Sequence, residues 1–325
     1  MKYFSILATG TVVAFFTWTG GVLLAQTYPC KSVRYIVPAP PGGTTDIVAR
    51  ITGQKVADAL GVPLPVDNRA GAGGIIGAEA LAKSAPDGCT IMMGNIGPNA
   101  INVSLYRKLP YDAEKDFAPI SQVIGVTNAL VVHPSVPART VKEFIAFVKA
   151  RPGQLTFASS GTGQSTHLSG ELFKTMAGLE YPHVPYKGSA PAMLDLVGGH
   201  VSFMFDNLPT AYPHIKGGKI RALGVTAGKR ARVLPDVPTI AQAGLPGYEV
   251  ESWFGVFAPS ATPRPLIERL HQELVKSLAM ADVRQKLEEQ GADIVGSSPA
   301  EFAAHVKREI AKWARVVKDS GARVE

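Results

Sequence analysis

Short apolar runs alternate with helix-patterned stretches along most of the 325-residue chain. The runs at residues 33–37, 90–93 and 155–158 are strand-like, whereas Asp46 to Leu60 repeats apolar residues at helical spacing and is followed by a glycine. Strands and helices that alternate in this way form mostly parallel α/β sheets. A chain of this length suits two packed lobes better than one domain. The pattern therefore predicts an α/β protein with two doubly wound, mostly parallel sheets.

The charge balance bears on the class of partner. Hydrophobic residues make up 46% of the chain, which is enough for a core, and the formal net charge is +7. Basic residues form no long run, and the densest patch is at 229–232. A basic average without a stripe favours small anionic ligands over nucleic acid. Charge that only keeps the protein soluble explains the balance equally well.

The first 25 residues have the pattern of an export signal. Lys2 is followed by an uncharged, largely apolar stretch from Tyr3 to Leu24, and Ala25 offers a small residue for cleavage. The stretch is also long enough for an uncleaved anchor. Its four threonines and three glycines make it weakly hydrophobic, which favours a cleaved signal peptide at 1–25.

Two cysteines, Cys30 and Cys89, remain after such a cleavage, in an oxidising compartment. Each precedes or begins a strand-like run, at 33–37 and 90–93, and these strands would be neighbours in a doubly wound sheet. We therefore expect that a disulfide can join them. The alternative is that both are independent small apolar residues.

Two glycine-rich turns, at 40–46 and 159–166, share one chemistry. Each follows an apolar strand, carries small hydroxyl residues and opens a helix. A helix N-terminus leaves backbone N–H groups unpaired and carries about half a positive charge, so such a turn can bind an anion. Neither turn contains lysine or arginine, which favours carboxylates over phosphates. Because ligands of open α/β sheets bind beyond the carboxyl ends of the strands, the two turns are predicted to face each other across a cleft.

The residues give little support for catalysis or metal binding. Ser159, Ser160, His167 and Asp206 can be combined into a hydrolase triad, but no nucleophile-elbow pattern surrounds either serine. The seven histidines are dispersed, which disfavours a metal site. Asp206 ends an apolar run, where a carboxylate is either a helix N-cap or an acceptor on the ligand side. We therefore expect a protein that is not an enzyme and uses no cofactor.

From Tyr28 to about Val317 the chain resembles the Bug (TctC-like) substrate-binding proteins of tripartite tricarboxylate transporters. The matching segments are residues 37–43 with Asp46, 68–74, 109–112, 115–119, 161–168, 184–188, 234–239, 244–248 and 253–255. The resemblance implies a type II periplasmic-binding fold with lobe 1 at 26–126 and 254–325 and lobe 2 at 127–253. Two segments, near 125–128 and 251–254, would cross between the lobes.

The resemblance also implies which residues hold a ligand. In the family, the first and second βα loops bind carboxylates and a third loop lies beside them. Matched by position, the ligand-binding residues are Pro41, Gly42, Gly43, Thr44, Thr45, Asp46, Ser159, Ser160, Gly161, Thr162, Gly163, Thr166, Gly188, Ser189 and Ala190, with Asp206 as a residue linked to ligand choice.

The implied function is a monomeric periplasmic receptor. It would capture a small mono- or dicarboxylate by closure of the lobes and deliver it to the integral-membrane permease subunits of a tripartite tricarboxylate transporter. Two alternatives stay open from sequence: a carboxylate-sensing receptor for a signalling system, and a periplasmic serine hydrolase that uses Ser159 or Ser160.

Overall fold

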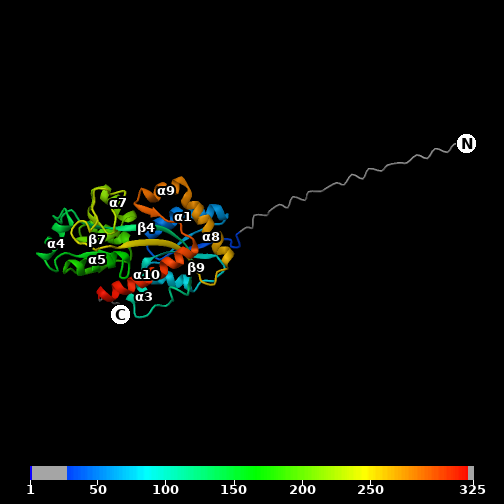
Figure 1. Ribbon diagram of the computed structural model, residues 1–325, viewed down its shortest axis with the longest axis horizontal. Coiled ribbons are helices and arrows are strands. Elements are labelled where there is room, and N and C mark those ends of the chain that lie inside the picture. The colour runs from blue at the N-terminus through cyan, green and yellow to red at the C-terminus, as the bar shows by residue number, and fades with distance from the viewer. Residues whose placement is uncertain (2–27, 321–325) are drawn as a thin grey trace.

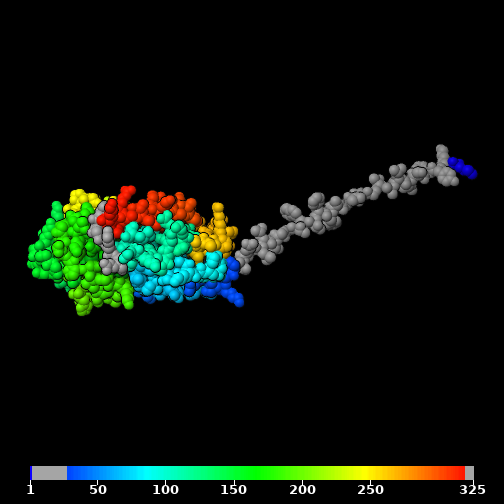
Figure 2. All heavy atoms as spheres, turned by 90° about the horizontal axis from the view of Figure 1, so that it is seen from below, coloured from blue at the N-terminus to red at the C-terminus, as the bar shows by residue number. Residues whose placement is uncertain are grey.

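The computed structural model describes Met1 and residues 28–320, so the predicted signal peptide lies outside the described residues. Figure 1 shows two α/β halves side by side, with long strands running from one into the other. Within residues 28–320, no helix is both long and apolar enough to cross a membrane. In the space-filling view of Figure 2, the two halves occupy opposite ends of one elongated body.

We use lobe 1 for one half and lobe 2 for the other. Lobe 1 contains β1 (Arg34–Val37), α1 (Thr44–Leu60), β2 (Val66–Asn68), η1 (Ala72–Gly74), α2 (Ile75–Ala82), β3 (Thr90–Asn95), η2 (Gly97–Ile101), α3 (Asn102–Leu105), α8 (Arg264–Ala279), α9 (Ala281–Glu288), β10 (Ala292–Ile294) and α10 (Pro299–Ser320). Lobe 2 contains α4 (Val141–Lys149), β5 (Phe157–Ser159), α5 (Ser165–Ala177), β6 (His183–Pro185), α6 (Ser189–Val197), β7 (Phe203–Asn207), α7 (Leu208–Lys216) and β8 (Arg221–Val225).

Two long strands, β4 (Phe117–Val132) and β9 (Glu251–Pro259), join the lobes. The strand order is β2-β1-β3-β9-β4-β7-β5-β6, and β8 and β10 also pair with β4. The pairs β1–β2, β1–β3, β5–β6 and β5–β7 are parallel, whereas the joining strands pair antiparallel. β4 pairs with β9 as far as Thr127 and with β7 from Asn128 onward. The predicted lobe boundaries fall within these strands and stay a prediction, because one sheet runs through them.

Local sequence signals explain where several helices begin and end. Gly61 and Gly178 follow α1 and α5 with φ of 69° and 60°, the left-handed region that glycine adopts at low cost. Thr140 accepts a hydrogen bond from the Glu143 N–H at the start of α4 (3.1 Å). Ser298 and Glu301 form a reciprocal capping box at the start of α10.

The C-terminal helix α10 packs against β4 and β9 and also contacts α5 of lobe 2. The buried indoles of Trp253, on β9, and Trp313, on α10, both donate to a carboxylate oxygen of Glu309, at 3.3 and 3.1 Å. Phe302 of α10 packs edge-on against Trp253. These contacts of α10 therefore hold the joining strand β9 in place.

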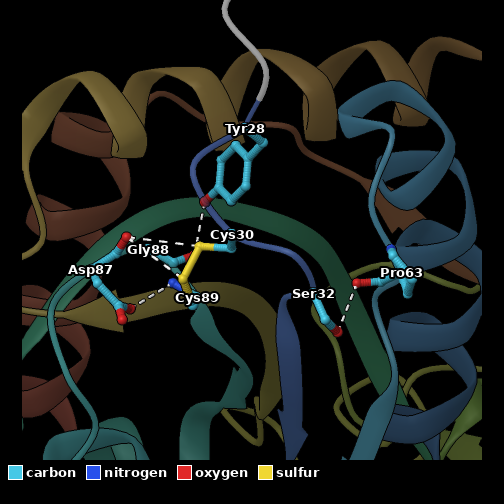
Figure 3. The surroundings of a disulfide bond; sticks show 7 residues. All are labelled: Tyr28, Cys30, Ser32, Pro63, Asp87, Gly88 and Cys89. Atoms are coloured by element: carbon cyan, nitrogen blue, oxygen red, sulfur yellow. Dashed lines mark hydrogen bonds between the residues drawn. A yellow bond between two sulfur atoms is a disulfide. The ribbon is translucent and has the colours of Figure 1, made fainter.

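A disulfide joins Cys30 to Cys89, as Figure 3 shows. β1 and β3 are parallel neighbours with Arg34 opposite Thr90, which brings the segments before both strands together. The Tyr28 hydroxyl donates to the Gly88 carbonyl at 2.8 Å and ties the same two segments. The predicted bridge is confirmed, and the alternative of two unlinked cysteines is wrong.

Candidate functional site

A cavity of about 200 Å³ lies between the lobes, at the carboxyl ends of β1 and β5. Glycines, hydroxyl residues and amides dominate its wall. The lining residues are Pro38, Ala39, Pro40, Gly43, Thr44, Thr45, Gly71, Ala72, Gly73, Gly74, Asn95, Tyr106, Ser160, Gly161, Thr162, Gln164, Ser165, Pro185, Tyr186, Lys187, Gly188, Ser189, Asn207, Ser252 and Phe254. Lys187 is the one formally charged side chain in this described lining, and it is exposed.

Four helix N-termini converge on the cavity. Thr44 opens α1, Ser165 opens α5 and Ser189 opens α6, and all three line the wall. Asn207, the N-cap of α7, lines it too, and no side chain caps any of these helices. Each first turn leaves backbone N–H groups without helical partners and presents the positive end of the helix dipole. The wall therefore attracts anions mainly through neutral donors, and the exposed Lys187 adds the one cationic side chain of the described lining.

Eight of the predicted ligand residues line the cavity. They are Gly43, Thr44, Thr45, Ser160, Gly161, Thr162, Gly188 and Ser189. The other eight lie outside the lining: Pro41, Gly42, Asp46, Ser159, Gly163, Thr166, Ala190 and Asp206. Ligand binding by any of the sixteen stays a prediction, but the structure gives several of the second group partners within the protein.

Asp46 is one of these. Its carboxylate accepts hydrogen bonds from the Gly42 N–H (3.0 Å) and Asn68 Nδ2 (2.9 Å), and Arg50 Nε lies at 2.9 Å. Burial acts to raise the pKa of Asp46, but the bonds from Arg50, Gly42 and Asn68 outweigh it and the pKa is lowered. Asp46 is therefore ionised, and its hydrogen bonds hold the first loop (residues 40–46) against β2.

Thr166 and Ser159 have similar supporting positions in the second loop. The buried Thr166 Oγ1 accepts from the Ser160 N–H at 2.9 Å and pairs with Ser160 Oγ at 2.7 Å. Ser159 Oγ accepts from the Gly161 N–H at 3.2 Å and lies 2.7 Å from His183 Nε2. These bonds fix the turn on which Gly161 and Thr162 face the cavity.

Asp206 lies behind the cavity wall and is fully buried. Ser189 Oγ donates to its Oδ1 at 2.6 Å, whereas its Oδ2 has no hydrogen-bond partner among the described residues. Burial raises the pKa of Asp206 to about 7. Asp206 is therefore connected to the cavity by its hydrogen bond with Ser189, which lines the cavity wall.

Sequence reasoning missed part of the wall. The turn at 71–74 closes one side, and Tyr106, Asn207 and Phe254 lie at other points of the lining. The glycines at 71–74 were visible as a motif, and Asn207 follows the conspicuous Asp206. Tyr106 and Phe254 carry no local signal, because only the tertiary fold brings them to the cavity.

Direct hydrogen bonds join the two lobes around the cavity. Gln164 Nε2 donates to the Gly73 carbonyl at 2.7 Å, and the hydroxyls of Thr44 and Thr210 are 2.8 Å apart. A side chain on Gly73 would overlap the Thr162 carbonyl. The structure is therefore a closed arrangement in which backbone touches backbone across the cleft.

This geometry does not support the alternative hypothesis of a serine hydrolase. Ser159, which contacts His183, is fully buried and outside the cavity lining. Ser160 does line the cavity, but its hydroxyl pairs with Thr166 rather than with a histidine. A nucleophile needs both an activating base and access to substrate.

Comparison with known proteins decides the family. The family model for the tripartite tricarboxylate transporter family receptor matches residues 48–322. The chain belongs to this receptor family. It is 38% identical over 318 residues to protein BugT of Bordetella pertussis, which covers 97% of this chain and 98% of BugT.

Solved structures of similar receptors share the architecture. The structure of R. palustris Rpa4515 with adipate has a TM-score of 0.89 at 41% identity and covers 91% of this chain and 100% of that chain. MatC from Rhodopseudomonas palustris with bound malate has a TM-score of 0.86 at 35% identity and covers 89% and 100%. The predicted type II periplasmic-binding fold is confirmed, and the receptor family is not a family of enzymes.

Proposed function

We propose that this receptor works in the periplasm, captures a small carboxylate by closure of its lobes and delivers it to membrane permease subunits of a tripartite tricarboxylate transporter. One observation carries the proposal. The N-termini of α1, α5, α6 and α7 surround a cavity whose described lining contains no acidic residue. Such a wall stabilises a compact anion that has lost its water shell.

Carboxylates fit the wall better than phosphates do. The first loop offers Thr44 and Thr45, and the second offers Ser160 and Thr162, so hydroxyl and backbone donors face each other from both lobes. A phosphate-binding loop usually adds a lysine directly after its last glycine, which neither loop does. Two facing loops can hold one carboxylate, or a dicarboxylate with one end in each. The adipate and malate in Rpa4515 and MatC agree with this choice.

The proposal is tested by a thermal-shift screen of mono- and dicarboxylates, with the diamides of adipate and malate as neutral controls. A ligand that binds only the folded protein stabilises it by about 2.7 kcal/mol at a concentration of 100 Kd. We expect at least one carboxylate to raise the melting temperature in proportion to the logarithm of its concentration, and its diamide to have no effect. Equal shifts from acid and amide, or no shift from any carboxylate, would contradict the proposal.

A further inference from the structure

Two histidines, the buried His167 and the half-buried His183, lie beneath the second loop (residues 159–166), outside the cavity lining. His167 is on α5 and His183 opens β6, and their rings stack with centroids 4.4 Å apart and planes inclined by 22°. His167 Nδ1 accepts a hydrogen bond from the Gly163 N–H at 3.3 Å. His183 Nε2 lies 2.7 Å from Ser159 Oγ, which accepts from the Gly161 N–H at 3.2 Å.

These bonds anchor the two residues on either side of Thr162, which lines the cavity. The N–H groups of Gly161 and Gly163 are turned inward, one onto Ser159 and one onto His167. Both glycines have positive φ, 132° and 85°, so backbone conformation alone does not hold the turn in one shape. The segment needs fixed acceptors behind it.

We propose that His167 and His183 are positioning residues that set the second loop for ligand binding, through one specific ring nitrogen each. The inference rests on the proposed function, in which that loop holds the carboxylate. His167 acts through Nδ1, directly on Gly163. His183 acts through Nε2, because it fixes the Ser159 hydroxyl that accepts the hydrogen bond from the Gly161 N–H.

The protonation states agree with these roles. Nδ1 of His167 accepts an N–H, so it carries no proton, and a protonated ring would place two donors face to face. Burial, with a smaller contribution from His183, lowers the pKa of His167 to about 3. Burial, followed by Lys174, lowers the pKa of His183 to about 4. Glu171 lies 3.9 Å from His167 Nε2, and Lys174 stands over the ring of Tyr181. Both rings are therefore neutral at neutral pH.

The two roles can be separated with asparagine and glutamine. An asparagine amide occupies the place of the histidine Nδ1, whereas a glutamine amide reaches the place of Nε2. We expect His167→Asn and His183→Gln to keep the affinity for adipate and malate within about threefold of wild type. His167→Gln and His183→Asn should each lose about tenfold, since each breaks one hydrogen bond.

Calorimetry measures the affinity, and amide hydrogen exchange of Gly161 and Gly163 in the ligand-free protein gives a second readout. Exchange should quicken at Gly163 in His167→Gln and at Gly161 in His183→Asn, and stay slow in the two conservative variants. Equal losses in all four variants would show that the rings only fill space and would overturn the proposal, as would unchanged exchange in all four. If wild type binds no carboxylate, the proposed function fails, while the exchange pattern still decides the role of the histidines.

Discussion

Replacing Asp206 by asparagine should raise the free energy of unfolding by about 4 kcal/mol at pH 8. Burial raises the pKa of this carboxyl from 3.8 to about 7, so the folded protein binds its proton more tightly than the unfolded chain does. The resulting stability is complete below pH 3.8 and is lost as pH rises through 7. The difference between a pKa of 3.8 and one of about 7 corresponds to about 4 kcal/mol. Asparagine avoids the buried charge and still accepts from Ser189.

Urea unfolding of wild type and Asp206→Asn between pH 5 and pH 8 measures this effect. The gain should grow from about 2 kcal/mol at pH 5 to about 4 kcal/mol at pH 8, because the wild-type penalty grows with pH. Asp236→Asn is the matched control, since it removes one negative charge from an exposed position of the same protein. A gain in the free energy of unfolding that is independent of pH, or equal in the two variants, would contradict the prediction. It would mean that the ionised Asp206 carboxylate does not destabilise the folded protein.

Gly163→Ala should lower the affinity for the ligand by about 10- to 100-fold. Gly163 belongs to lobe 2, and a Cβ there would overlap Asn102 Oδ1 of lobe 1, so the new methyl group would hold the lobes apart. Overpacking of this kind costs about 1–3 kcal/mol, and the cost falls on the closed state that binds ligand. Calorimetry with the best carboxylate from the screen measures the loss.

Gly247→Ala is the control for backbone strain. Gly247 has φ of 84° against 85° at Gly163, but its Cβ would meet no atom of the described chain within 4 Å. The two variants therefore share the cost of a left-handed alanine and differ in the clash. Wild-type affinity in Gly163→Ala, or an equal loss in Gly247→Ala, would contradict closure as the structure shows it.

The sequence predicts the two binding loops because their signals are local. A strand, a glycine turn and a helix start follow one another at 34–60 and again at 157–177, and the structure has β1–α1 and β5–α5 there. The role of Asp46 was less clear from sequence. An arginine four residues later is a signal for an ion pair on one helix face, and Arg50 does hold its carboxylate.

Other parts of the site could not be predicted in this way. The helices α6 and α7, whose N-termini complete the cavity, have nine residues each, and Pro209 and Pro213 in α7 resemble helix breakers. β10 has three residues and depends on its pairing with β4. The contact of His183 with Ser159 depends on the parallel register of β5 and β6, a tertiary feature that a single sequence does not contain.

Hydrogen–deuterium exchange with and without adipate or malate tests most directly whether both lobes hold one ligand. A bound carboxylate should slow exchange at 38–46 in lobe 1 and at 159–166 in lobe 2 together, with the same dependence on ligand concentration. Residues 227 and 229–232 line a separate hollow beside Gly291 and Asp293, and the segment 227–232 should exchange at unchanged rates. Protection in only one of the two loops, or at 227–232 instead, would contradict capture between the lobes.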